Sequence, residues 1–383
     1  MRLLVASDWH LGRLFHGTHL TDDQAFVLEQ FLTLARESRA EAVLIAGDVF
    51  DRAVPPPEAV QLLDETLARL ILDVKVPVIL IAGNHDSPIR LGFGAEVMAG
   101  SGLYVRGSYT GIDRPIILED KFGPLAVLPF PFAEPALVRR KLGGDDNFDQ
   151  QAALKARTQA WAPALSPEPT RSIALAHVFV AGGTASDSER PLSLGGQETV
   201  EPEVFANFNF TVLGHLHRPQ AAAAGNIIYP GSLLKYSFSE IKDKKSVCLL
   251  EIDARGSTRV ERIPLSPRRD MRKIEGSFDE IMAGPGPGES KDDYILISLR
   301  DKGPILDAVG RIREIYPNVL HLERPFLTAP DHDRPPTGDH RRLGELDLFR
   351  SFFHYAAGEA LSDAEEEVLV ESLSALSRLE REN

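Results

Sequence analysis

The stretch VPVILIAGNHDSP (Val76–Pro88) joins a fully apolar run to a cluster of polar side chains. Val78–Ile81 have the character of a strand that is buried on both faces of a sheet. Asn84, His85 and Asp86 follow almost at once, and none of these residue types suits a sheet interior. The sequence therefore predicts a buried strand that delivers an amide, an imidazole and a carboxylate to one point.

Four other apolar runs end in the same way. The five runs and their polar ends are Leu3–Ser7 before Asp8 and His10, Ala42–Gly47 before Asp48 and Asp51, Val78–Gly83 before Asn84 and His85, Ser172–Ala176 before His177, and Phe210–Gly214 before His215 and His217. Between the first three runs, Ala25–Ser38 and Pro55–Leu70 carry apolar residues at helical spacing. This alternation predicts a parallel α/β sheet, whose functional site lies beyond the carboxyl ends of the strands.

The polar ends have the composition of a metal site. Five of the 11 histidines lie in them, whereas a lone strand-end histidine is usually structural. Asp, Asn and His suit Mn²⁺, Fe, Zn²⁺ or Mg²⁺, and no thiolate is available for a structural zinc site. The candidate ligands are too many for one ion, which predicts two adjacent metal sites that share one carboxylate. These candidates are Asp8, His10, Asp48, Asn84, His177, His215 and His217. The glycines before Asp48, Asn84 and His215 are expected to turn the chain sharply off each strand.

Composition limits the class of protein. The chain has 383 residues, 43% of them hydrophobic, and a net charge of −14, which favours two or three domains and argues against generic affinity for nucleic acid. Its single cysteine, Cys248, excludes a disulfide framework and favours a reducing compartment. We find no signal peptide and no apolar stretch of ~20 residues. We therefore expect a soluble cytoplasmic protein with no membrane segment.

The pattern changes after the first 265 residues, which we expect to form one domain. A linker at 266–270 leads into a small α+β unit, predicted over 270–328, with a strand at Asp293–Leu299, a helix at Pro304–Tyr316 and a strand at Val319–Pro325. A second linker leads into a helical tail, predicted over 341–383. The first tail helix carries an apolar stripe, and the second begins with Ser362 and Glu365 as a capping box. From residue 344 onward, ten acidic and three basic residues give the tail a charge of −7.

The motifs together resemble a known superfamily. The set D-x-H, G-D-x-x-D, G-N-H-D, H and G-H-x-H resembles the calcineurin-like metallophosphoesterases. More narrowly, SDWHLG, GDVFDRAVPP, AGNHDS, GHLHRPQ and YPGSLLKYSFSE resemble the SbcD family, the nuclease subunits of bacterial SbcC–SbcD complexes and counterparts of the Mre nucleases. The resemblance covers most of residues 1 to 255. It implies a four-layer α/β/β/α sandwich, a smaller α+β capping domain and a C-terminal helical tail.

The resemblance also implies a role for each candidate residue. One metal would be held by Asp8, His10, Asp48 and His217, and the other by Asp48 (bridging), Asn84, His177 and His215. His85 would be catalytic, because it would stabilise the pentacovalent phosphorane or protonate the leaving oxygen. Asp51 would orient His85 through a hydrogen bond. The implied cofactors are two Mn²⁺ per chain, with Mg²⁺, Fe or Zn²⁺ as alternatives.

One position departs from the wider family. Archaeal and eukaryotic relatives carry a second histidine after the final Asp of G-D-x-x-D, where this chain has Arg52. A second catalytic imidazole is therefore not expected here. Arg52 is a candidate for contact with a DNA phosphate. The alternative is a solvated surface arginine.

The implied function is a Mn²⁺-dependent DNA exonuclease and endonuclease that acts with the ATPase SbcC in DNA replication, recombination and repair. We expect a homodimer within a heterotetramer, and the tail either docks on SbcC or packs on its own capping domain. A small-molecule or protein phosphoesterase would use the same ligands, and a non-enzymatic scaffold is a third class. The extra domain, the tail and the GSLLKYSFSE segment favour the nuclease.

Overall fold

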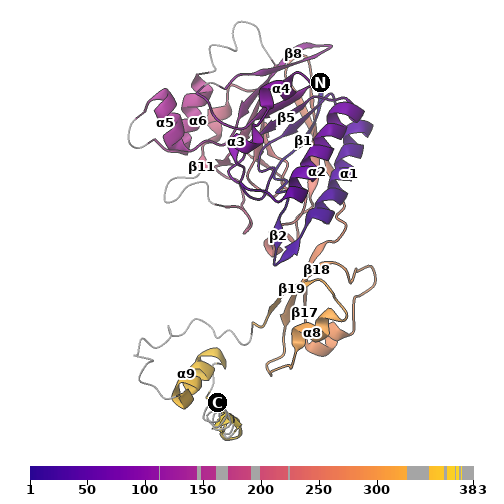
Figure 1. Ribbon diagram of the computed structural model, residues 1–383, viewed down its shortest axis with the longest axis vertical. Coiled ribbons are helices and arrows are strands. Elements are labelled where there is room, and N and C mark those ends of the chain that lie inside the picture. The colour runs from indigo at the N-terminus through magenta and orange to yellow at the C-terminus, as the bar shows by residue number, and fades with distance from the viewer. Residues whose placement is uncertain are drawn as a thin grey trace. The chain divides into compact units, whose positions relative to one another are not determined.

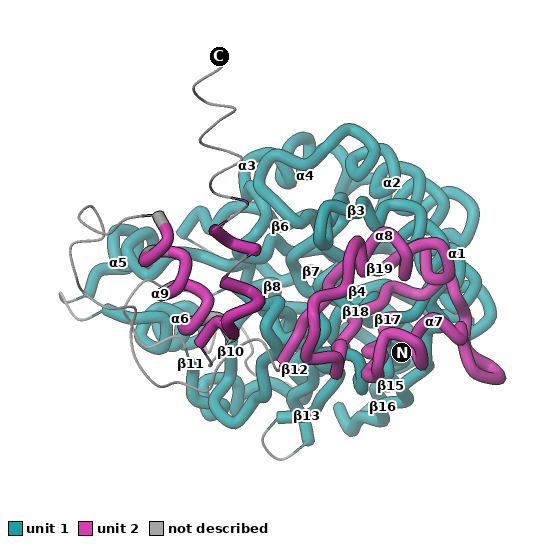
Figure 2. The backbone as a smooth tube through the Cα atoms, turned by 90° about the horizontal axis from the view of Figure 1, so that it is seen from below, with its two compact units in different colours: residues 1–270 teal, residues 271–383 magenta. Residues whose placement is uncertain are grey.

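The structure, a computed structural model, describes residues 1–111, 113–144, 148–160, 171–190, 199–222, 225–325, 345–357, 360–366, 368–370 and 372. The chain forms two compact units, Met1–Asp270 and Met271–Asn383, which Figure 2 distinguishes by colour.

Two six-stranded sheets form the centre of the first unit. One has the order β16 (Thr258–Pro264), β15 (Ser246–Ile252), β1 (Arg2–Ala6), β4 (Ala42–Ile45), β5 (Val78–Ile81) and β6 (Leu103–Arg106). The other has the order β13 (Gln220–Ala222), β14 (Ile227–Tyr229), β12 (Phe210–Gly214), β9 (Arg171–His177), β8 (Gly123–Phe130) and β7 (Ile116–Asp120). Strands β1, β4, β5 and β6 run parallel, as do β8, β9, β12 and β14, and the remaining strands pair antiparallel.

Helices cover the outer faces of this pair of sheets. Helices α1 (Thr21–Glu37) and α2 (Pro57–Ala68), with the π-helical turn η1 (Arg69–Val74), lie on one side, and α5 (Pro135–Leu142) and α6 (Gln150–Gln159) lie on the other (Figure 1). The shorter elements are β2 (Leu14–Phe15), β3 (Thr18–His19), α3 (Pro88–Leu91), α4 (Ala95–Ala99), β10 (Phe179–Val180), β11 (Thr199–Val200), η3 (Pro202–Phe205) and η4 (Phe238–Glu240).

Side-chain alternation explains the layers. Leu3 and Val5 of β1 share one core with Leu175 of β9 and Val212 of β12, so this core lies between the two sheets. Leu4 and Ala6 are equally buried but point to the other face, because successive strand residues alternate. The four-layer α/β/β/α sandwich is confirmed. The expectation of one parallel sheet was incomplete, because the five motif-bearing strands divide between two sheets.

The carboxyl ends of these strands converge across the two sheets. His177 at the end of β9 pairs with Gly214 at the end of β12. The Asp8 amide donates to the Gly47 carbonyl (3.0 Å) within the first sheet. The ring of His177 then reaches the first sheet, because its Nδ1 lies 2.9 Å from the Ala46 carbonyl. All five polar ends therefore meet at one edge of the sandwich.

The glycines at this edge are needed for two different reasons. Gly47 has φ +87°, as expected for a sharp turn. Gly83 and Gly214 lack a positive φ but leave no room for a side chain. A Cβ on Gly83 would lie 2.1 Å from Asp48 Oδ1, and a Cβ on Gly214 would lie 1.9 Å from the Ala46 carbonyl oxygen. At these two positions glycine permits close approach of the loops and not a turn.

The second unit contains a parallel three-stranded sheet, β17 (Met271–Gly276), β18 (Tyr294–Leu299) and β19 (Val319–Glu323). Helices α7 (Phe278–Met282) and α8 (Ala308–Arg313) pack on it around Ile295, Ile297 and Ile312. The sequence predicted β18, β19 and a longer version of α8, but not β17 or α7.

The tail is described in part. Helix α9 spans Glu345–Ala357, and Ser362 and Glu365 form the predicted capping box. Most of the second predicted tail helix, and the second predicted linker, lie outside the described residues.

The segment that joins the units is attached to helix α1. Gln30 exchanges two hydrogen bonds with the main chain of Ser266, and Arg268 lies 3.5 Å from Asp22. Asp270 accepts a hydrogen bond from Lys235 (2.7 Å). The predicted linker at 266–270 therefore has fixed partners in the first unit. None of the described helices has the length and apolar character needed to cross a membrane.

The close approach at Gly214 gives a first prediction. The variant Gly214→Ala places a methyl group against Ala46 O and 2.7 Å from His177 Nδ1. We expect its free energy of unfolding to fall by about 3 kcal/mol, since overpacking at a rigid contact forces backbone shifts. Chemical denaturation in EDTA measures this. Gly100→Ala is the matched control, because its nearest neighbour is 3.5 Å away and no change beyond about 0.5 kcal/mol is expected. Equal midpoints for the two variants would contradict this account of the sheet contact.

Candidate metal centre

The loops at the strand ends hold four candidate ligands in an unusual backbone conformation. Asp8 (φ 52°), His10 (φ 46°), Asp48 (φ 48°) and His215 (φ 102°) all have positive φ. This region is uncommon for residues other than glycine, and such strained positions concentrate at functional sites. The surrounding structure therefore holds these side chains in place at a cost in backbone energy.

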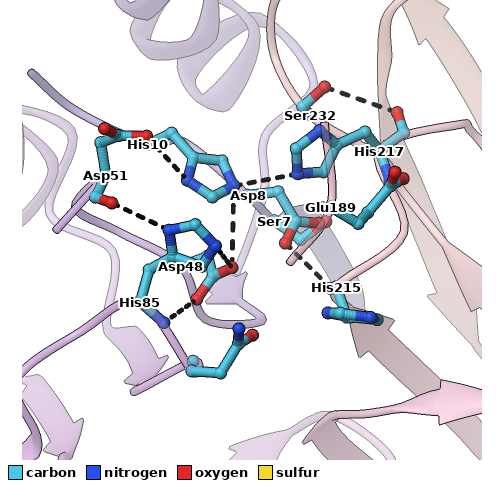
Figure 3. A network of polar contacts seen from close by, with 12 residues as sticks. Ser7, Asp8, His10, Asp48, Asp51, His85, Glu189, His215, His217 and Ser232 are labelled. Carbon is cyan, nitrogen blue, oxygen red and sulfur yellow. Dashed lines mark hydrogen bonds and ion pairs between the residues drawn. The ribbon is translucent and has the colours of Figure 1, made fainter. Parts of the chain in front are cut away.

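The carboxylate of Asp48 lies at the centre of the cluster. Its Oδ2 is 3.4 Å from His177 Nε2, 3.6 Å from His10 Nε2 and 3.8 Å from His85 Nε2. Its Oδ1 accepts the main-chain N–H of His85 (2.9 Å), as Figure 3 shows. One oxygen is thus fixed by the protein, and the other faces three imidazoles.

A second group of ligand atoms surrounds Asp8. The Nε2 atoms of His10 and His217 lie 3.0 Å apart (Figure 3). Asp8 Oδ1 accepts the His215 amide (2.9 Å), whereas its Oδ2 is buried and has no hydrogen-bond partner among the described residues. One ligand atom each from Asp8, His10 and His217 fits within 4.8 Å.

The remaining predicted ligands lie on the His177 side of Asp48. His177 Nε2 is 2.9 Å from Asn84 Oδ1. The ring centroids of His177 and His215 are 5.6 Å apart. One ligand atom each from Asp8, Asp48 and His177 also fits within 4.8 Å. The structure therefore brings all seven candidate ligands together, six of them buried and Asn84 half-buried.

His85 and Asp51 are also adjacent, but not as expected. His85 Nδ1 lies 2.8 Å from the main-chain carbonyl of Asp51, which can only accept, so Nδ1–H is the donor. The Asp51 carboxylate instead binds Arg13 (2.7 Å) and lies 3.7 Å from His10 Nδ1. The expected hydrogen bond between Asp51 and His85 is therefore present, but the main-chain carbonyl of Asp51 makes it and not the carboxylate, so Asp51→Asn would preserve it.

Arg52 follows this loop and is largely exposed. Its side chain is 55% exposed, and its Nη2 lies 3.9 Å from Asp51 Oδ2. Its guanidinium is therefore accessible to solvent at the border of the cluster.

Comparison with known proteins identifies the family. Residues 1–219 match the calcineurin-like phosphoesterase family, and residues 267–356 match the type 5 capsule protein repressor C-terminal domain. A curated relative, the D subunit of nuclease SbcCD from Staphylococcus saprophyticus, is 32% identical over 381 residues, which is 98% of each chain. The chain belongs to the SbcD family of calcineurin-like phosphoesterases.

Solved structures resemble the chain only distantly. TT1561 of Thermus thermophilus covers 68% of this chain and 98% of its own, with 16% identity and a TM-score of 0.40. A dimetal phosphatase from Danio rerio covers the same shares, with 11% identity and a TM-score of 0.41. These likenesses are too distant to bear on function.

The residues present in this SbcD-family chain fit a pair of divalent ions. Asp8 Oδ2 is a buried carboxylate oxygen without a hydrogen-bond donor in the described structure. His10 and His217 direct their Nε2 atoms at each other at a distance that one shared ion would explain. Carboxylate, amide and imidazole ligands together suit divalent ions such as Mn²⁺, Fe²⁺ or Zn²⁺. Without a cation, this much buried negative charge and this many ring nitrogens would be poorly compensated.

Burial and mutual charge displace the pKa values of the cluster. Burial lowers the pKa of His10 and of His215 well below the ordinary value. Burial also lowers the pKa of His177, but the charge and hydrogen bond of Asp48 outweigh it and raise that pKa to about 9. Burial raises the pKa of Asp8 to about 6. The proton on His177 therefore takes the place of a cation beside Asp48.

Several positioning residues carried no functional assignment in the sequence analysis. Asp86 accepts the amides of Val49, Phe50 and Gly83, and so ties together the loops that carry Asp48 and Asn84. Asp86 is the last residue of the GNHD motif, and its place in that motif is the sequence signal that indicates a role at the site.

Gln24 and Tyr236 hold the loop of His10 from behind. Gln24 Nε2 donates to the Trp9 and His10 carbonyls and to the hydroxyl of Tyr236, which itself donates to Trp9 O. Tyr236 belongs to the GSLLKYSFSE segment. This segment therefore supports the candidate ligands although it contains none of them. Helical periodicity marked α1 but gave no indication that its Gln24 points at the site.

The raised pKa of His177 predicts proton release on metal binding. An ion at Nε2 needs the neutral ring, so between pH 6 and 9 its binding should displace about one proton per chain, and affinity should rise about tenfold per pH unit. Below pH 6 Asp8 adds a second proton to be displaced, and above pH 9 the dependence should flatten. Isothermal titration calorimetry with Mn²⁺ in buffers of different ionisation enthalpy measures this proton. A pH-independent affinity between 6 and 9 would contradict it.

Proposed function

We propose that this chain is a metal-dependent DNA nuclease that hydrolyses phosphodiester bonds and acts with the ATPase SbcC in DNA replication, recombination and repair. The observation that supports it most strongly is the 98% mutual coverage with the D subunit of nuclease SbcCD. If this chain shared only the metal ligands with its relative, the similarity would support a phosphatase as well as it supports a nuclease. Here the match extends over nearly the whole length of both chains, and so includes the second unit.

The proposed cofactors are two Mn²⁺ ions per chain. The proposed location of the protein is the cytoplasm. We assign Asp8, His10, Asp48 and His217 to one ion, and Asp48, Asn84, His177 and His215 to the other. The central place of Asp48 Oδ2 among three imidazoles supports its bridging role. Two such ions would supply a hydroxide at neutral pH and neutralise charge on the attacked phosphate.

His85 is the proposed catalytic residue. Its Nδ1–H donates to the Asp51 carbonyl, so the neutral ring presents an unprotonated Nε2 to the site. Burial lowers its pKa, whereas a substrate phosphate beside Nε2 would raise it. The imidazolium formed in this way would stabilise the phosphorane or protonate the departing oxygen.

Arginines next to the candidate-ligand loops offer local positive charge in an acidic protein. Arg13 binds Asp51, Arg90 donates to the Ala53 carbonyl, and Arg52 is largely exposed. We propose that Arg52 contacts a DNA phosphate. Such contacts position the backbone of the substrate without reading its sequence.

We further propose that the chain is a homodimer within a heterotetramer with SbcC. Immediately after the GNHD loop, Ile89, Phe93 and Val97 are 79%, 85% and 84% exposed at intervals of four residues. Such an exposed apolar ridge is typical of an interaction surface. We assign it to contact with a second copy of the chain. The acidic tail with α9, whose Phe349 and Phe352 are exposed, we assign to SbcC.

The function is tested with purified full-length chain and Mn²⁺ on linear duplex, single-stranded DNA and p-nitrophenyl phosphate esters. We expect DNA cleavage to dominate, and His85→Ala to bind two ions but to lose ~10²–10⁴-fold in rate. Asp48→Ala should lose metal, because it removes the anion between two cations. Cleavage of the small esters with no cleavage of DNA would favour the phosphoesterase alternative. Metal loss in His85→Ala would show that His85 is a ligand.

The dimer is tested with Phe93→Glu, which places a charge on the apolar ridge. We expect this variant to be a monomer in light scattering where the wild type is a dimer, with its metal content unchanged. Leu306→Glu is the control, because Leu306 is equally exposed but lies in the second unit. A dimeric Phe93→Glu would assign the dimer contact to another surface.

A further inference from the structure

His217 is the candidate ligand whose polar atoms are most completely fixed. Its amide donates to Glu189 Oε1 (2.8 Å). Its carbonyl accepts from Lys245 Nζ (2.8 Å) and from the Ser232 amide (3.1 Å). Its Nδ1 lies 2.5 Å from Ser188 Oγ. Only Nε2 remains, and it points at His10 (Figure 3).

The contact with Ser188 continues into a buried ion pair. Ser188 Oγ hydrogen-bonds Glu240 Oε1, and Glu240 Oε2 lies 2.6 Å from Lys245 Nζ. The side chains of Glu240 and Lys245 are at most 5% exposed, and Ser188 is also buried. His217, Ser188, Glu240 and Lys245 therefore form one continuous chain of polar contacts, which we call the Ser188 relay.

The direction of each hydrogen bond in the relay follows from which groups carry a hydrogen that they can donate. A carboxylate paired with a lysine has no hydrogen to give, so Glu240 accepts from both neighbours. The single hydrogen of the Ser188 hydroxyl is therefore used toward Glu240. Ser188 Oγ must then accept from His217, which places the His217 proton on Nδ1 and leaves the Nε2 lone pair free.

The other histidines of the cluster are held differently. His177 and His85 each direct Nδ1 at a main-chain carbonyl, of Ala46 and Asp51 respectively. His10 Nδ1 has no hydrogen-bond partner among the described residues. The Asp51 carboxylate lies 3.7 Å from His10 Nδ1 without a hydrogen bond. Among these four, only His217 is linked to a carboxylate through a hydrogen-bonded hydroxyl. Such a partner fixes the tautomer and raises the basicity of the ligand nitrogen.

We propose that Ser188 and Glu240 are positioning residues that hold His217 in the Nδ1–H tautomer and thereby set the affinity of the metal site shared with Asp8 and His10. The inference rests on the proposed metal centre. Ser188 lies on the loop after β10 and Glu240 in η4, so two segments outside the five ligand motifs control one ion. The second site, around His177 and Asn84, does not contact the relay.

Ser188→Ala removes the hydroxyl link, and calorimetry with Mn²⁺ alone on the metal-free full-length chain measures the result. We expect one of two binding events to weaken ~10–100-fold and the other to change less than about threefold. Ser188→Thr restores the hydroxyl and should rescue affinity. Ser246→Ala is the matched control, because Ser246 is also buried but its hydroxyl has no hydrogen-bond partner among the described residues, and it should change either affinity by less than about threefold.

The tautomer is read independently from the ring ¹⁵N shifts of His217 in the metal-free protein, assigned with His217→Gln. We expect only Nδ1–H in the wild type and a mixture of tautomers in Ser188→Ala. A wild-type ring with Nε2–H, or unchanged affinities in Ser188→Ala, would overturn the inference. A wild-type chain that binds no Mn²⁺ contradicts the proposed function instead, and the tautomer measurement then still decides the relay.

Discussion

The buried carboxylate of Asp48 is the constraint on which the site depends. A carboxylate removed from water is costly unless positive charge or hydrogen bonds compensate it. One oxygen is satisfied by the His85 amide, and the other faces the Nε2 atoms of three histidines. In the metal-free protein a proton on His177 provides the missing charge. Because Asp48 raises the pKa of His177 to about 9, this positive charge is present at neutral pH.

The architecture brings these groups together. Residues on one strand can place only one or two side chains at a sheet edge, and the five clusters come from strands of two sheets. Packing the sheets face to face sets their carboxyl ends against each other, and the absence of side chains at Gly83 and Gly214 lets the loops touch. The positive φ values of Asp8, His10, Asp48 and His215 show that the loops accept backbone strain for this placement.

The candidate ligands are held in place by specific contacts from other residues. Asp86 joins two ligand loops through three amides, Gln24 and Tyr236 hold the His10 loop, and the Ser188 relay holds His217. Gln24, Tyr236, Ser188 and Glu240 lie outside the loops that they support, whereas Asp86 lies in the Asn84 loop itself and reaches across to the Asp48 loop. This distribution gives the GSLLKYSFSE segment a structural role at the site although it contains no candidate ligand, because it carries Tyr236 and Glu240.

The sequence by itself determined the five motif-bearing strands and the identity of the clustered residues, because buried strands and polar O/N side chains at their ends have local signatures. It also predicted the capping box at Ser362, a motif contained in four residues. Only the tertiary structure decided that the strands divide between two sheets, since burial on both faces looks the same in either sheet. It also decided that the main-chain carbonyl of Asp51 accepts the hydrogen bond from His85, and that Glu240 is linked to the His217 ring through the Ser188 hydroxyl. The hydrogen bonds concerned join residues 34 and 52 positions apart in the chain, and hydrophobic periodicity carries no information about how such segments are placed.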